Sequence, residues 1–124
     1  MTKNVFISYH FSNRDRQGQL EFWLLEAGYK PDAVYEKDLN GESEQAGKRK
    51  LQEKLDKAEY VIFLVGQDAH NSPWIRFEVS EARKRGLQVF WIQLPNTSGA
   101  VPPEARNLRQ LRYEKDEIIW ALRH

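Results

Sequence analysis

Three short stretches of the chain are mostly apolar, β-branched or aromatic, and none of them alternates regularly between apolar and polar residues. They read NVFISY at 4–9, EYVIFLVG at 59–66 and LQVFWIQL at 87–94. Runs of this length and composition are typical of strands that are covered on both faces. We therefore expect these segments to be central strands of a parallel sheet.

Apolar residues at helical spacing predict two helices between the first two runs. The first helix ends at Gly28, because glycine is the usual residue just beyond a helix C-terminus. The second helix lies immediately before the run at 59–66. The apolar faces consist of Leu20, Trp23, Leu24 and Ala27 in the first helix and of Leu51, Leu55 and Ala58 in the second.

Weaker patterns predict the remaining segments of the chain. Glycine and proline mark two of them as loops. In chain order, these segments are a weak strand at 33–36, a polar loop at 37–47, a loop at 95–105, an edge strand around 111–113 and a helix at 116–123 capped by Asp116.

The alternation of strands and helices predicts an α/β fold for a single domain over residues 1–124. We expect a flavodoxin-like, doubly wound parallel sheet of about five strands with helices on both faces. Ligands of such sheets bind beyond the carboxyl ends of the strands, where the winding reverses. This point falls between the first and third strands.

One acidic residue conflicts with the helical pattern of the stretch SPWIRFEVSEA at 72–82. Ser72 and Pro73 are suited to begin a helix. Glu78 then falls within the apolar arc, beyond the first turn where a capping box or the helix dipole would explain a carboxylate. Burial of a carboxylate costs several kcal/mol unless it is paired or functional. The alternatives are therefore a structural ion pair, for instance with Arg14, and a functional site. The arc also contains Trp74, Ile75, Val79 and Ala82.

The loops after the first and third strands supply further candidates at the predicted crevice. Some of them also have a structural interpretation: His10 and His70 bridge loop backbone, Asp68 and Asn71 form turns, and Trp74 packs in the core. The basic residues 83–85 are expected to be the solvated end of their helix. The candidates are Ser8, Tyr9, His10, Phe11, Asn13, Asp15, Asp68, His70, Asn71 and Trp74.

Composition removes several classes of function. The 124 residues carry 19 basic and 18 acidic side chains, and this balance favours neither a nucleic-acid nor a membrane-surface partner. Cysteine is absent, which excludes disulfides and thiolate metal sites, and no metal is expected. The segment at 41–50 lacks the glycine spacing of a phosphate-binding loop. No apolar run approaches the roughly 18 residues of a membrane span, and we expect a cytoplasmic protein.

The order of three stretches resembles the TIR (Toll/interleukin-1 receptor) domain, and most closely the bacterial TIR-like proteins of Thoeris antiphage defence. These stretches are VFISYHFSNRD, KLDKAEYVIFLVG and SPWIRFEVSEA. The resemblance implies that Glu78 is catalytic, because NAD-cleaving members have a catalytic glutamate four residues after the tryptophan. It also implies that the segment 37–48 gates the site and mediates assembly. This segment is polar here and lacks the proline often found there.

The implied activity is release of nicotinamide from NAD, with an ADP-ribose-derived signal, linear or cyclic, as the product. NAD is then a substrate, and no cofactor is implied. Tyr9, Asn13 and Asp15 would orient ribose or phosphate, and Phe11 and Trp74 would stack on a base. The implied partners are TIR-like domains, a phage-derived trigger and an effector that senses the product. Two alternatives are a non-catalytic interaction module and a nucleoside deoxyribosyltransferase.

Overall fold

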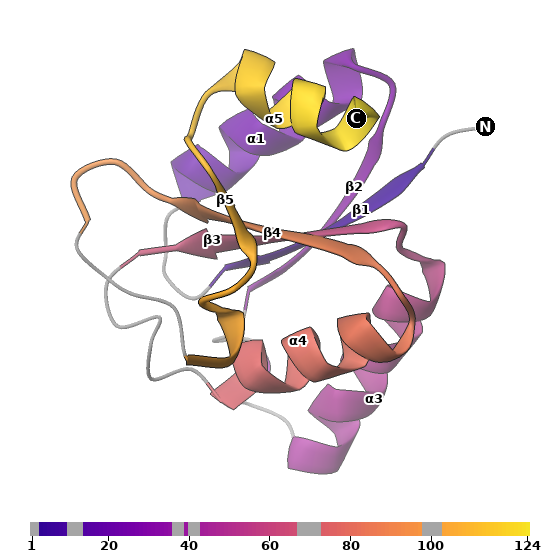
Figure 1. Ribbon diagram of the computed structural model, residues 1–124. Coiled ribbons are helices and arrows are strands. Elements are labelled where there is room, and N and C mark those ends of the chain that lie inside the picture. Colours follow the sequence, from indigo (N-terminus) through magenta and orange to yellow (C-terminus); the bar gives the residue numbers. More distant parts are fainter. Residues whose placement is uncertain (1–2, 10–13, 36–38, 40–42, 67–72, 98–102) are drawn as a thin grey trace.

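The computed structural model describes residues 3–9, 14–35, 39, 43–66, 73–97 and 103–124 (Figure 1). Its sheet has five parallel strands in the order β2-β1-β3-β4-β5. This is the flavodoxin-like order, so the predicted fold class is confirmed. The strands are β1 (Asn4–Tyr9), β2 (Lys30–Tyr35), β3 (Tyr60–Val65), β4 (Gln88–Gln93) and β5 (Arg109–Leu111).

Helices cover both faces of the sheet (Figure 1). One face carries α1 (Arg14–Glu26) and α5 (Lys115–Arg123), and the other carries α3 (Glu44–Lys57) and α4 (Pro73–Lys84). A short 3-10 turn, η2 (Pro103–Ala105), precedes β5. Within the described residues, every helix is too short or too polar to span a lipid bilayer.

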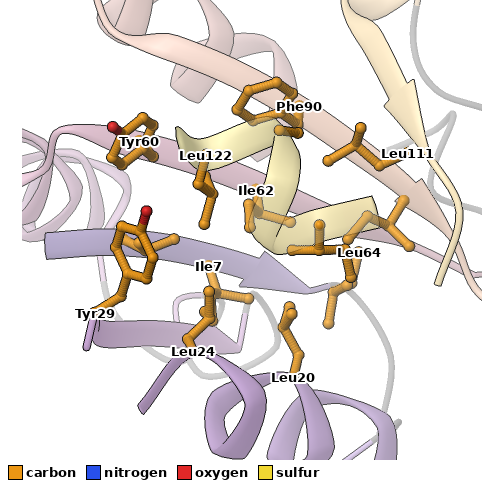
Figure 2. Close-up of a cluster of buried hydrophobic side chains, with 14 of the residues drawn as sticks. Ile7, Leu20, Leu24, Tyr29, Tyr60, Ile62, Leu64, Phe90, Leu111 and Leu122 are labelled. Atoms are coloured by element: carbon orange, nitrogen blue, oxygen red, sulfur yellow. The ribbon is translucent and has the colours of Figure 1, made fainter. Parts of the chain in front are cut away.

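The side chains of β1 divide between two apolar clusters, because successive residues of a strand point to opposite faces. Ile7 and Tyr9 belong to the cluster beneath α1 and α5, and Phe6 belongs to the cluster beneath α3 and α4. Figure 2 shows the first cluster, with Ile7 of the sheet among helical leucines such as Leu24 and Leu122. The two faces of β1 therefore serve different layers.

Helices α1 and α4 end with the same backbone arrangement. Gly28 has φ 89° and Gly86 has φ 66°, a region that favours glycine. The amide of Tyr29 donates to the carbonyl of Leu24, and the amide of Leu87 donates to that of Ala82. This is the Schellman pattern, which satisfies carbonyls left over at a helix end. The predicted end of the first helix is confirmed.

Three predicted boundaries are wrong near the sheet edges and in the second helix. Helix α3 begins at Glu44, within the predicted loop, because Ser43 Oγ accepts a hydrogen bond of 3.1 Å from the amide of Ala46. The weak strand lies at 30–35 instead of 33–36, and the edge strand at 109–111 instead of 111–113. Local sequence pattern locates such short elements poorly, since pairing with the neighbouring strand sets their register.

The prediction that Asp116 caps the closing helix is also wrong. Glu114 occupies the N-cap position of α5, and its side chain makes no capping hydrogen bond. Asp116 lies within the first turn instead. A carboxylate is favourable there because it faces the positive end of the helix dipole.

A glycine in the first turn of α3 allows α3 and α4 to approach closely. A Cβ atom at Gly47 would lie 2.6 Å from Cη2 of Trp74, whose side chain is buried on α4. Lys48 Nζ, on the next residue, lies 5.5 Å from the ring centroid of Phe77. These contacts fix the first turn of α4 against α3.

We expect Gly47→Ala to lower the free energy of unfolding by about 1–3 kcal/mol, because the added methyl group overpacks a buried contact. This loss should appear although alanine favours helices over glycine by about 1 kcal/mol. Urea unfolding measures the change.

Gly18→Ala is the matched control, since no atom lies within 4 Å of a Cβ placed at Gly18 in α1. The control should gain up to about 1 kcal/mol. Equal gains at both glycines would contradict the packing argument.

Candidate active site

The Glu78 carboxylate is buried and contacts β1, an inner strand of the sheet. The residue has 0% of its surface exposed, and Ser8 has 2%. Ser8 Oγ donates a hydrogen bond of 3.0 Å to Glu78 Oε1. The sequence expectation that an acid points toward the core is therefore met, and one of its contacts is a hydroxyl 70 positions earlier in the chain.

Two local patterns bring these side chains together. On α4, the buried residues Ile75, Val79 and Ala82 share a face with Glu78 and hold that face against the sheet. On β1, Ser8 follows Phe6 by two positions, so both side chains point toward α3 and α4. The two side chains therefore meet between the sheet and α4.

The contact lies at the end of β1 where a ligand crevice is expected. Ser8 and Tyr9 are the last two residues of β1. This strand pairs with β2 on one side and with β3 on the other, and the winding reverses between β1 and β3. Doubly wound sheets bind their ligands at this position. Ser8 and Glu78 thus meet at the switch point of the sheet, and ligand binding there stays a prediction.

Tyr9 and Trp74 lie near this position, but each packs in a different apolar layer. The side chain of Tyr9 joins the cluster beneath α1 and α5, on the opposite face of the sheet from Glu78. Trp74 is 9% exposed and packs on Gly47 within the other cluster. Asp15 is exposed in the first turn of α1. Their roles toward a substrate stay predictions.

The other candidates lie outside the described residues. The Arg14 side chain, the partner suggested for a structural ion pair with Glu78, also lies outside them. No group of three or more His, Asp or Glu residues in the described part of the chain could hold a metal ion. The candidates outside are His10, Phe11, Asn13, Asp68, His70 and Asn71.

A family model adds the decisive comparison. The model of the Thoeris protein ThsB TIR-like domain matches residues 6–99, more than half of the chain. The chain belongs to this TIR-like family. The matched span includes both Ser8 and Glu78, so the contact described above lies within the TIR-like domain. A comparison with curated protein sequences finds no significant match.

Solved structures share the fold of this TIR-like domain. A CMP N-glycosidase, BcmB of Clostridium botulinum, is 16% identical with a TM-score of 0.63, and the match covers 98% of this chain and 100% of that one. A flavodoxin-like domain from Synechococcus is 16% identical with a TM-score of 0.60, over 97% and 99% of the chains. A 3-dehydroquinate dehydratase-like protein of Bifidobacterium longum is 14% identical with a TM-score of 0.59, over 99% and 94%. At these identities the likeness establishes the fold alone.

The TIR-like domain has a second buried acid on α4 that sequence reasoning missed. Glu81 is 5% exposed and accepts hydrogen bonds from Gln52 Nε2 at 3.0 Å and from Lys84 Nζ at 2.9 Å. Arg85 adds a contact of 3.2 Å from Nη1. In the sequence, Lys84 and Arg85 follow Glu81 by three and four residues. This helical spacing is the pattern that could have predicted the ion pairs. Glu81 thus joins α4 to α3.

Arg85 corrects the expectation that residues 83–85 form a solvated helix end. Its side chain is 23% exposed, and Nη2 lies 2.8 Å from Oδ1 of Asp56 on α3. The guanidinium therefore bridges the two helices through Asp56 and Glu81. The planar group suits this role because its donors can contact two carboxylates at once.

The Lys84 hydrogen bond, with those of Gln52 and Arg85, lowers the pKa of Glu81 from 4.5 to about 2, against the opposing effect of burial. A lowered carboxyl pKa stabilises the fold above the unfolded value, and this stability is lost as pH falls through the folded value. We expect Glu81→Gln to lower the free energy of unfolding at pH 7 by about 2 kcal/mol. The difference from the parent should shrink as pH falls from 4.5 to about 2.

Glu53→Gln provides the control, because Glu53 is exposed on α3, the helix against which α4 packs. Denaturant unfolding over this pH range should leave the control parallel to the parent. A gap for Glu81→Gln that is constant with pH would contradict the assignment.

Proposed function

We propose that this TIR-like domain cleaves the N-glycosidic bond between nicotinamide and ribose in NAD and forms an ADP-ribose-derived signal, linear or cyclic, in antiphage defence. The observation that carries the proposal is the buried Glu78 carboxylate, held by Ser8 at the end of β1. A buried carboxylate at the switch point of a doubly wound sheet is a candidate for chemistry. Membership of the Thoeris TIR-like family supports the proposal.

One carboxylate is sufficient for the bond-breaking step. The bond between ribose C1′ and the pyridinium nitrogen breaks, and its electron pair neutralises the nicotinamide ring, which needs no proton to leave. The ribose becomes an oxocarbenium-like cation. Glu78 stabilises this positive charge electrostatically. Water then adds to C1′ and releases a proton, or a nitrogen of the adenine base adds and closes a ring.

The burial of Glu78 sets a condition on this reaction. Its carboxylate has no exposed surface in this structure, so a substrate reaches it only after a rearrangement uncovers it. Covering the site also excludes water, which strengthens the electrostatic interaction and favours capture of the cation by an internal nucleophile. We propose that a phage-derived trigger or assembly with further TIR-like domains supplies this rearrangement. An effector that senses the nucleotide product would then respond.

The similarly folded CMP N-glycosidase favours a broader test of substrates. Its name specifies an N-glycosidic bond of a nucleotide, the class of bond that NAD also contains. The shared fold does not transfer this activity. Both compounds, together with deoxynucleosides, therefore belong in one assay.

We expect purified protein to release nicotinamide from NAD, alone or after addition of a filtrate from phage-infected cells. Glu78→Gln should lower this rate about 100- to 1000-fold, because it removes the charge that stabilises the cation. Glu53→Gln, with an exposed carboxylate, should match the parent. Chromatography of nicotinamide and of the ribosyl product measures both.

The same assay separates the alternatives. Base exchange from deoxynucleosides with NAD untouched would indicate a deoxyribosyltransferase, and cytosine release would indicate a CMP N-glycosidase. A protein inert toward every substrate under both conditions would indicate an interaction module. A Glu78→Gln variant as active as the parent would remove the proposed mechanism.

A further inference from the structure

Among the buried residues of β1, Ser8 alone has a side chain that is neither aromatic nor aliphatic. The others are Val5, Phe6, Ile7 and Tyr9. Its partners in register are Val34 on β2 and Phe63 on β3, both apolar and buried. Burying a hydroxyl among such neighbours costs about 1–3 kcal/mol unless it is hydrogen-bonded. Glu78 provides that hydrogen bond.

The direction of the hydrogen bond follows from the chemistry of the pair. An ionised carboxylate only accepts hydrogen bonds, so the Ser8 hydroxyl must donate its single hydrogen to Oε1. The serine then has no donor left for a phosphate or carbonyl oxygen of a substrate. Its position in this structure is therefore better suited to holding the carboxylate than to binding the substrate.

The glutamate needs such a contact because its terminal torsion is weakly constrained. The rotation that orients a glutamate carboxylate has broad minima. A donor on a central strand limits this rotation, since β1 is hydrogen-bonded to β2 and β3 on its two sides. Functional groups held by a rigid element keep the geometry that a reaction requires.

We propose that Ser8 is a positioning residue that orients the Glu78 carboxylate toward the ribose of the substrate. This inference rests on the proposed N-glycosidic cleavage, and it replaces the expectation that Ser8 binds the substrate directly. The hydroxyl acts through Glu78 and stays within the protein interior throughout the reaction.

The test measures kcat and KM for nicotinamide release by Ser8→Ala and Ser8→Thr. Ser8→Ala removes the donor, so kcat should fall about 10- to 100-fold, as for loss of a charge-assisted hydrogen bond, while KM stays within about threefold. Ser8→Thr keeps the hydroxyl on a residue that suits a strand, and its kcat should stay within about threefold of the parent. In a Glu78→Gln background, Ser8→Ala should cause no further loss.

Ile7→Val is the matched control for stability. Ile7 lies on the same strand but faces the opposite cluster, and the substitution should destabilise the fold modestly without changing kcat. If the added methyl of Ser8→Thr lowers the midpoint of unfolding, Ser8→Cys replaces it. The weak donor of cysteine should then give a kcat between those of the parent and Ser8→Ala.

If Glu78→Gln is inactive, two results would overturn the positioning role of Ser8 and leave the proposed function intact. One is a raised KM with unchanged kcat for Ser8→Ala, which would make Ser8 a substrate contact. The other is a Ser8→Ala variant that loses stability but retains both constants, which would make its role structural. An active Glu78→Gln would instead remove the proposed function, and this inference with it.

Discussion

The hydrogen bond between Ser8 and Glu78 joins α4 to β1, an inner strand of the sheet, and places the acid of the proposed chemistry at the switch point. A carboxylate with no exposed surface is expensive to bury. A hydroxyl at 3.0 Å offsets part of that cost and gives the charged group a defined direction.

The packing of α3 against α4 keeps this carboxylate at its place on the sheet. Trp74 packs on Gly47 in the turn before Glu78, and Glu81 contacts Gln52 in the turn after it. The helix that carries Glu78 is thus held on both sides of the site. The position of Glu78 on the sheet therefore depends on how α3 packs against α4.

The two buried acids of α4 show how environment separates roles. Glu81 accepts hydrogen bonds from two cationic side chains and an amide, which keep its pKa at about 2 and make it a structural element. Glu78, three residues earlier, meets the hydroxyl of a strand at the switch point of the sheet. Since many functions use this fold, the case for N-glycosidic chemistry depends on the position of Glu78 at this switch point and on membership of the TIR-like family.

The sequence by itself determined the α/β class, the central strands and the position of Glu78 within an apolar arc. These features depend on the composition of a short segment and on the period at which its apolar residues recur. Both can be read from that segment alone. Edge strands and helix starts were less predictable. Pairing with the neighbouring strand decides the position of an edge strand, and the start of α3 depends on the cap at Ser43. The tertiary structure alone decided that Ser8 and Tyr9 serve opposite faces, that Glu81 and Arg85 join two helices, and that Trp74 packs on Gly47. Most of these contacts join residues that are far apart in the chain. Which side chains meet depends on strand register and on the rotation of each helix about its axis, and the packing of the whole domain sets both.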